Sequence, residues 1–214
     1  MRLKSLFNGV VLSLVMASQA LCQISYNSTS FESLATAETD AGPEYSYIIN
    51  RGDEVGADGT YNYSETGEAP GYYSSASVTV EHASALRANG FDLTGNARGY
   101  VSDDYGYAQA SANAESIAYI TFTLDRPRRI SLSGMFSLTG SSQPEGYSNY
   151  FEIRRANGKL VKSSSGVGPF SYLGRLPAGT YSLYVSSSVY RALSGGGDAY
   201  ENSTASFNVA VTAR

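Results

Sequence analysis

The feature of this sequence that most restricts its fold is an alternation of apolar and polar residues with a period of two. Residues 118–124 and 130–138 each place apolar side chains at every second position. Side chains of a β-strand point alternately to the two faces of a sheet, so this pattern predicts strands with one buried face. Almost no periodic segment of the chain shows the repeat of about 3.6 residues that an amphipathic helix requires.

The same alternation predicts further strands. It appears in residues 77–81, 108–114, 180–186 and 205–211. Alanine occupies the buried phase of residues 108–114, and although alanine favours helix by propensity, its strict alternation with polar residues suits a strand whose buried face packs closely. Strands at short intervals, separated by Gly, Ser, Asn and Pro, predict an all-β fold: an antiparallel β-sandwich that is jelly-roll-like.

The predicted strands divide the chain into three parts. We expect residues 75–214 to form the sandwich core, residues 23–74 to be a less regular segment rich in Gly, Tyr and acidic residues, and residues 1–22, whose pattern is described below, to be a signal peptide. Residues 45–50 and 59–63 are candidate strands within this segment. We expect the segment to supply the first strands of the sandwich or a partly ordered extension.

A hairpin is predicted at Asn157-Gly158, with two possible registers. A two-residue turn sets Ile153 opposite Lys162. A three-residue loop, with the glycine in the left-handed conformation, sets Ile153 opposite Val161 and Glu152 opposite Lys162. We favour the three-residue loop, because it pairs an apolar residue with an apolar one and a charge with its countercharge.

The N-terminus has the pattern of a secretion signal. Arg2 and Lys4 precede an apolar stretch, Leu6 to Ala17, and small residues continue to Cys22. Cleavage after Ala20 and cleavage after Cys22 are equally compatible with this pattern. The sequence therefore predicts a protein that is secreted, or periplasmic or extracellular, once the signal is removed.

Cysteine content and charge restrict how the exported chain is stabilised and what it binds. Cys22 is the only cysteine, so the remainder has no disulfide and depends on its core for stability. Removing Arg2 and Lys4 leaves 13 of the 15 basic residues against 19 acidic ones, a formal charge of −6. Nucleic acid is a poor partner for an acidic chain, and the apolar runs after the signal are too short to cross a bilayer. We expect no nucleic-acid partner and no membrane span in the mature chain.

Three segments resemble a class of exported bacterial domains. They are Ile120-Thr121-Phe122-Thr123-Leu124, the hairpin around Asn157-Gly158, and Leu176-Pro177-Ala178-Gly179-Thr180-Tyr181-Ser182-Leu183-Tyr184-Val185. Residues 115–212 are similar to the β-sandwich domains of PEP-CTERM-type surface proteins, without their sorting tail, and more distantly to pre-peptidase C-terminal domains. The resemblance implies a bacterial source, a turn followed by a core strand in the last of these segments, and no particular functional residue.

The only histidine limits the catalytic chemistry open to the chain. A Ser-His-Asp triad or a Cys-His pair would depend on His82, and a site with several histidine ligands is excluded. His82 is in phase with Val78 and Val80 on the apolar face of a predicted strand. This position predicts a structural histidine.

Acidic residues in predicted loops suggest two kinds of site. Calcium takes oxygen ligands from such loops, and Asp103 and Asp104 are our preferred ligands for a calcium ion, the one possible cofactor. A pair of carboxylates could instead serve a glycan hydrolase, which needs an acid and a base at a set separation. No motif assembles such a pair, so we predict no catalytic residue.

Tyrosines near Gly- and Ser-rich segments are candidates for sugar binding. Exposed aromatic faces stack on sugar rings. The predicted ligand-binding residues are Tyr72, Tyr73, Tyr105 and Tyr107. The chain contains no Trp, and tyrosine is also common on the half-exposed face of any sheet.

Basic residues gather in two neighbouring segments: Arg126, Arg128 and Arg129, then Arg154, Arg155, Lys159 and Lys162. An acidic exopolysaccharide could bind there through charge-assisted hydrogen bonds. Alternatively, charges on edge strands prevent strands of other molecules from adding to the sheet.

These observations predict an exported, non-enzymatic β-sandwich protein with a structural, adhesive or matrix-associated role at the cell exterior. Its expected partner is extracellular polysaccharide or surface matrix. A carbohydrate-binding module is the alternative, and a carboxylate-dependent glycan hydrolase is the third hypothesis.

Overall fold

Twelve β-strands make up the computed structural model, which describes residues 24–39, 45–54, 60–71, 73–103, 109–141, 143–194 and 199–214. No helix, and therefore no helical membrane span, occurs among these residues. The strands are β1 (Ile24–Thr39), β2 (Tyr45–Glu54), β3 (Thr60–Pro70), β4 (Ser74–Arg87), β5 (Gly90–Asp103), β6 (Gln109–Leu124), β7 (Arg128–Gly140), β8 (Gly146–Arg155), β9 (Leu160–Ser165), β10 (Gly168–Leu176), β11 (Gly179–Ser194) and β12 (Ala199–Ala213).

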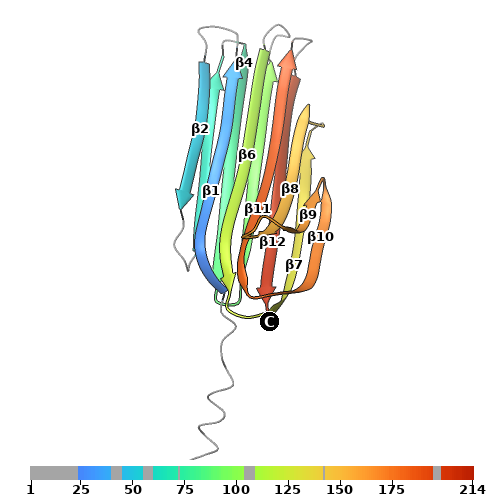
Figure 1. Cartoon of the computed structure of the whole chain (residues 1–214). Helices are drawn as coiled ribbons and strands as arrows, with labels where there is room; N and C mark the ends of the chain where they lie inside the picture. The colour runs from blue at the N-terminus through green and yellow to red at the C-terminus, as the bar shows by residue number, and fades with distance from the viewer. Residues whose placement is uncertain are drawn as a thin grey trace, which may run out of the picture.

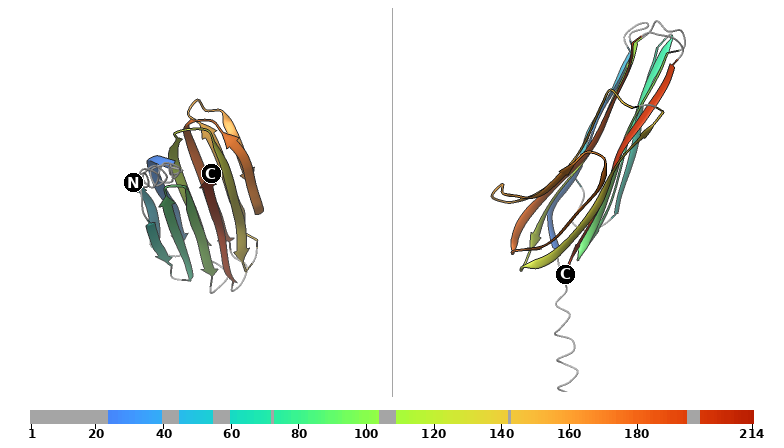
Figure 2. Two further views of the ribbon diagram at one scale, coloured as in Figure 1. Left: turned by 90° about the horizontal axis from the view of Figure 1, so that it is seen from below. Right: turned by 90° about the vertical axis from the view of Figure 1, so that its right-hand side faces the viewer.

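The strands form two six-stranded sheets that pack face to face (Figures 1 and 2). Sheet A has the order β2-β1-β6-β11-β8-β9, and sheet B has the order β10-β7-β12-β5-β4-β3. Neighbouring strands are antiparallel throughout. The chain passes repeatedly between the sheets, for example from β6 to β7 and from β11 to β12. The predicted all-β, antiparallel, jelly-roll-like sandwich is confirmed.

Strands β1, β2 and β3 are integral parts of the two sheets. β1 pairs with β6 from Ile24, opposite Leu124, to Thr39, opposite Ala110. β2 extends sheet A beyond β1, and β3 extends sheet B beyond β4. The described part of residues 23–74 thus contributes three strands, whereas the predicted signal, residues 1–22, lies outside the described residues.

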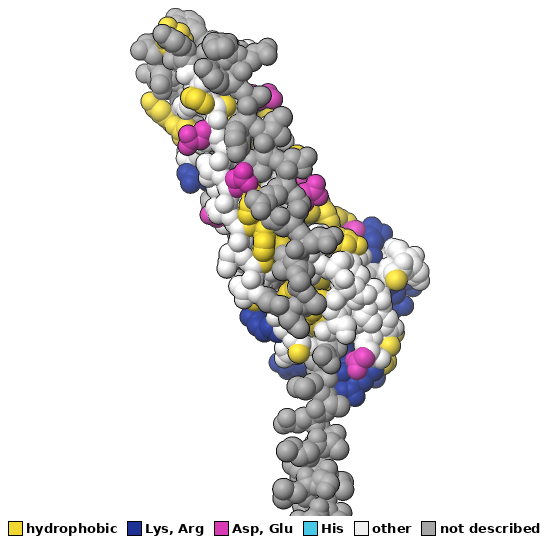
Figure 3. Space-filling view, turned by 90° about the vertical axis from the view of Figure 1, so that its left-hand side faces the viewer, with side chains coloured by type: hydrophobic (Ala, Val, Ile, Leu, Met, Phe, Trp, Pro, Cys, Tyr) yellow, Lys and Arg dark blue, Asp and Glu magenta, His cyan; other side chains and the backbone are white. Residues whose placement is uncertain are grey.

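The size of the buried side chains differs between the two ends of the strands. At the end where β6 and β12 finish, which we call the phenylalanine end, large buried side chains meet, among them Phe91, Phe122, Phe136, Phe151 and Leu183. At the opposite alanine end the buried side chains are small, among them Ala35, Ala97, Ala112, Ala114 and Ala205. Small side chains let the sheets approach each other, and Figure 3 shows the molecule narrowing toward the alanine end.

A buried polar layer separates these two parts of the core. Ser33, Ser116, Ser187 and Asn149 form one cross-strand row of sheet A, and none is more than 3% exposed. His82 faces this row from sheet B, with Nε2 2.9 Å from Ser33 Oγ and Nδ1 3.1 Å from Ser116 Oγ. Ser187 Oγ donates to Asn149 Oδ1 at 2.7 Å. Because buried polar groups are costly without partners, this layer specifies how the two sheets face each other.

Gly95 makes room for the polar layer. It lies opposite His82 in β4 and opposite Phe207 in β12. A Cβ atom at this position would lie 2.3 Å from Ser116 Oγ and 2.4 Å from the Phe207 ring. The close approach of the sheets therefore requires glycine here.

The hairpin between β8 and β9 corrects one prediction from the sequence. Its loop has three residues, and Gly158 has a φ of 80°, as predicted. Beyond the loop, a bulge at Val161 shifts the register, so that Ile153 lies opposite Lys162. The predicted pairs of Ile153 with Val161 and of Glu152 with Lys162 are wrong. The extra residue of the bulge allows the Val161 side chain to pack against the core. A prediction based only on residues paired across the two strands does not include this packing.

Replacing Gly95 with alanine tests the close approach of the sheets. We expect Gly95→Ala to lower the free energy of unfolding by about 1–3 kcal/mol, because Ser116 or Phe207 must move. Gly146→Ala is the matched control, since its Cβ would find its nearest neighbour, Tyr190 Cβ, at 3.6 Å. Urea unfolding of both variants measures the difference, and equal stability of the two would contradict this account.

Candidate functional site

Two of the six residues predicted for calcium and sugar binding are described. Tyr73 precedes β4 and is 45% exposed, whereas Asp103 ends β5 and is buried. Because Ser74 lies opposite Asp103, the structure brings both predicted residues to the alanine end of sheet B. The remaining four lie outside the described residues: Tyr72, Asp104, Tyr105 and Tyr107. Both hypotheses therefore stay predictions.

His82 is enclosed rather than presented to solvent. Besides its two serine contacts, its ring lies 5.3 Å from the Phe31 ring and 6.0 Å from the Tyr63 ring, between centroids. A surface hollow of about 350 Å³ borders it, with Glu81 and Asn96 in its lining. Within the described ranges, no three His, Cys, Asp or Glu side chains gather in a way that could hold a metal ion. The burial of His82 and its contacts with two serines are what a structural histidine requires, as predicted from its place on the apolar face.

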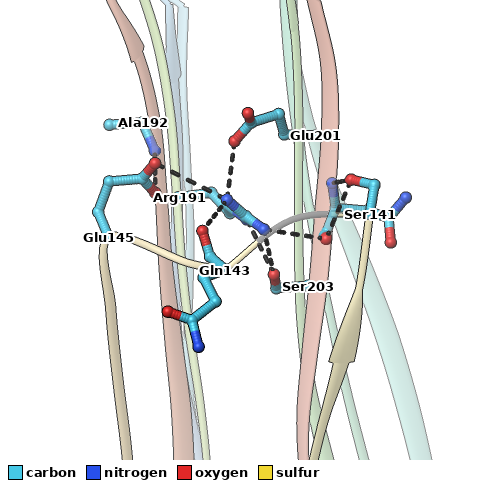
Figure 4. Close-up of polar contacts among 8 residues, drawn as sticks. Ser141, Gln143, Glu145, Arg191, Ala192, Glu201 and Ser203 are labelled. Atoms are coloured by element: carbon cyan, nitrogen blue, oxygen red, sulfur yellow. Dashed lines mark hydrogen bonds and ion pairs between the residues drawn. The ribbon is translucent and has the colours of Figure 1, made fainter.

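Arg191 is a fully buried charge at the alanine end (Figure 4). Its Nη1 donates to Glu201 Oε2 and to the backbone oxygen of Gln143, both at 2.7 Å. Its Nε and Nη2 donate to Ser203 Oγ at 2.9 and 2.6 Å. Glu145 Oε1 lies 3.7 Å from Nη1. One guanidinium thus connects β11, β12 and the segment that leads into β8.

The phase of β11 explains why Arg191 is inside. Tyr181, Leu183 and Val185 point into the core, and the same alternation continues through Val189 to Arg191. A charged residue in a buried phase is a sequence signal for a paired ion, because burial without partners costs several kcal/mol. The sequence therefore indicates that Arg191 is buried. It does not indicate the partners of Arg191, because they come from another strand and from a turn.

Three tyrosines, one exposed and two half-buried, lie on the outer face of sheet A, and we call this surface the tyrosine face. Tyr119 of β6 lies opposite Tyr184 of β11, and Tyr119 is 39% exposed. Tyr150 of β8 lies next to Tyr184, with ring centroids 6.2 Å apart. The strands β6, β11 and β8 are neighbours in the front sheet of Figure 1, so the three tyrosines belong to one continuous region of its outer face.

A fixed carboxylate accompanies these rings. Glu152 lies opposite Tyr184 and accepts a hydrogen bond from the Tyr150 hydroxyl at 2.7 Å. Arg154 donates to both carboxylate oxygens, with Nε at 2.7 Å and Nη2 at 2.8 Å. These bonds from Arg154, more than that from Tyr150, hold the pKa of Glu152 below its usual range, while the bond to Glu152 raises the pKa of Tyr150. Glu152 therefore stays ionised beside the rings.

A second acidic group lies farther along the same face. Glu115 of β6 is half-buried, and burial, together with the charge of Glu32 in β1, raises its pKa. Sheet A thus presents both aromatic rings and hydrogen-bonding groups to solvent. A polyhydroxylated ligand uses both kinds of contact.

The sequence predicts the tyrosine face only in part. Alternation places Tyr119 and Tyr184 on the polar side of their strands, and this phase is correct. The sequence predicts sugar binding at other tyrosines near Gly and Ser, namely Tyr72, Tyr73, Tyr105 and Tyr107. Strand order, which the sequence does not specify locally, is what puts Tyr150 beside Tyr184.

The basic residues singled out in the sequence separate in the structure. Arg128 is buried and its Nη2 pairs with Asp125 Oδ1 at 3.1 Å, and Arg126 approaches the same carboxylate at 3.9 Å. Arg129 points away from the core on sheet B, whereas Arg154 lies on sheet A with Glu152. The predicted cluster is therefore distributed over both faces.

Comparison with known proteins assigns no family. The chain matches no protein-family model and no curated protein. Among solved structures, it is similar to infectious bursal disease virus, Gx strain, at 13% identity and a TM-score of 0.24, covering 91% of this chain and 58% of the viral one. It is also similar to the VP2 subviral particle of infectious bursal disease virus, at 12% identity and a TM-score of 0.22, covering 88% and 57%. The chain thus spans less than two thirds of either viral chain, and likenesses at this level support no conclusion about function.

Loss of the Arg191 charge should strongly destabilise the protein. Arg191→Met leaves Glu201 and Ser203 without their donor, and we expect the free energy of unfolding to fall by about 3 kcal/mol. Arg98→Met, at an exposed arginine of β5, is the control and should change stability little. Denaturant unfolding at pH 7 compares them; a loss in Arg191→Met no larger than in the control would refute a stabilising role for the network.

The pKa of Glu152 can be tested directly. The pKa of Glu152 is lower in the folded protein than in the unfolded chain. The contacts of the ionised carboxylate therefore stabilise the fold at pH values above the pKa of an unfolded carboxyl group. This stabilisation is lost as the pH falls through the pKa of the folded state. We expect the carboxyl carbon of Glu152, followed by NMR, to titrate below the ordinary range in the wild type and to move upward in Arg154→Gln. The same midpoint in both proteins would show that Arg154 has no such effect.

Proposed function

We propose that this chain is an exported, non-enzymatic protein that acts at the cell exterior as an adhesive or matrix-associated component by binding polysaccharide through the tyrosine face. The observation that supports this most directly is the presence of Tyr119, Tyr184 and Tyr150 on one face of three neighbouring strands, with Tyr119 opposite Tyr184 and the Tyr150 ring beside it. Export is supported by the signal pattern at residues 1–22.

The tyrosine face suits an extended sugar chain for geometric reasons. Directly opposed side chains of antiparallel strands have Cβ atoms about 5 Å apart, so Tyr119 and Tyr184 start from neighbouring positions on the same face. Tyr184 and Tyr150 continue the surface toward β8. A tyrosine side chain has only two rotatable torsions, so little conformational entropy is lost when a ligand stacks on it.

Glu152 adds a hydrogen-bond acceptor in a fixed position to this surface. Its carboxylate is fixed from two sides by Tyr150 and Arg154, so its position is set before a ligand arrives. A sugar hydroxyl near Tyr184 would find a charged acceptor in a defined place. Charge-assisted hydrogen bonds of this kind are stronger than neutral ones.

Retention on insoluble polysaccharide tests the proposal. We expect the purified protein to bind cellulose, chitin or starch, and Tyr119→Ala and Tyr184→Ala each to weaken binding about fivefold, with a larger loss in the double variant. Tyr200→Ala is the matched control, because Tyr200 is a 63% exposed tyrosine on sheet B. It should bind like the wild type.

Two outcomes would contradict the proposal. If the tyrosine variants and the control bind equally, the tyrosine face is not the binding surface. If soluble reducing sugar is released during incubation, the protein is a glycan hydrolase and not a non-enzymatic binder. Circular dichroism of each variant separates a loss of binding from a loss of fold.

A further inference from the structure

Three arginines lie side by side on the outer face of sheet B, at the phenylalanine end. Arg175 of β10 is opposite Arg129 of β7. Arg129 also exchanges two backbone hydrogen bonds, of 3.0 and 2.9 Å, with Arg214, which follows β12. All three are exposed, and the adjoining residues Ile130, Leu176 and Ala213 are buried. We call Arg129, Arg175 and Arg214 the arginine row.

In the absence of a ligand, repulsion between the like charges of the arginine row destabilises the folded protein. Opposed side chains on antiparallel strands are close neighbours, and like charges in these positions are destabilising. Acidic groups at this end are engaged elsewhere: Asp125 pairs with Arg128 at 3.1 Å, and Asp92 pairs with Arg87 at 2.6 Å. Among the described residues, no Asp or Glu side chain pairs with a member of the row. Stability of the sandwich alone does not account for this arrangement.

A hollow adjoins the row. Arg129 and Arg214 line a space of about 300 Å³ together with Ser131 and Leu173. Guanidinium groups bind carboxylates through two parallel hydrogen bonds, and Ser131 adds a hydroxyl that can donate or accept. Leu173, which is 63% exposed, provides an apolar wall against which ring carbons can pack. The hollow thus offers contacts for both an anionic group and a sugar ring.

The phenylalanine end carries many of the basic residues, although the chain as a whole is acidic. Figure 3 shows most of the visible Lys and Arg side chains in the lower half of the molecule, at the phenylalanine end, and most of the Asp and Glu side chains in the upper half. Arg126, Arg155 and Lys159 lie at strand ends near the phenylalanine end. A basic region of this kind raises the local concentration of an anionic polymer and speeds its association.

We propose that the arginine row binds the carboxylates of an acidic polysaccharide. This inference rests on the proposed function in that the ligand is a polysaccharide, but it uses a different site, on the opposite sheet from the tyrosine face. A bound uronic acid replaces the repulsion between the arginines with attraction to a shared anion. With one site on each outer face, a single molecule can connect two polysaccharide chains.

Binding to polygalacturonate tests this site. In about 50 mM salt, where surface charges are only partly screened, we expect the wild type to be retained on immobilised polygalacturonate. The double variant Arg129→Gln, Arg175→Gln should bind roughly tenfold more weakly, because it loses two charge-assisted contacts. The thermal midpoint of the free variant should be equal to or above that of the wild type, since like-charge contacts are removed.

Arg98→Gln is the matched control. Arg98 is an exposed arginine on the same face of sheet B, opposite Thr204, which is opposite Thr139. Thr139 is about 33 Å from Arg129 along β7. The control should bind polygalacturonate like the wild type, which separates a local site from a general effect of net charge.

The outcomes distinguish this site from the tyrosine face. Retention of the double arginine variant on neutral polysaccharide should be unchanged, and retention of Tyr119→Ala on polygalacturonate should persist. If the arginine double variant binds polygalacturonate as well as the wild type, or if Arg98→Gln loses as much, the inference is wrong, whatever the result for the tyrosine face.

Discussion

The close packing of two sheets is the constraint on which the rest of this structure depends. No disulfide links the strands, since the sequence has a single cysteine at position 22. Strands of up to 16 residues must therefore match each other side chain by side chain across the sandwich. Phenylalanine and leucine fill the wide part, alanine fills the narrow part, and Gly95 is one of the positions where even a methyl group does not fit.

Polar groups inside the sandwich complement this packing. Apolar side chains of similar size tolerate a shift of one sheet along the other, whereas His82 between Ser33 and Ser116 does not, because its two ring nitrogens would lose their partners. Arg191 has a comparable role at the alanine end, where it joins two strands and a turn. The buried polar residues thus reinforce the alignment of the sheets that the packing of the apolar core requires.

Much of the fold was predictable because alternation is a local property. The buried phases of residues 118–124, 130–138 and 180–186 follow from the sequence, as does the left-handed Gly158. The bulge at Val161 was not predictable from pairing rules, since it is compensated by packing against residues far along the chain. The arginine row has the same origin: Arg129 and Arg214 are far apart in sequence and meet only because β12 lies beside β7.

The two ends of the sandwich differ in charge. Basic groups such as Arg129 and Arg175 lie at one end, and acidic groups such as Glu38 and Glu68 lie near the other. Such a molecule has an electric dipole along its long axis. In the field of a negatively charged layer it experiences a torque that turns the phenylalanine end toward the layer, so it would settle with one orientation before any specific contact forms.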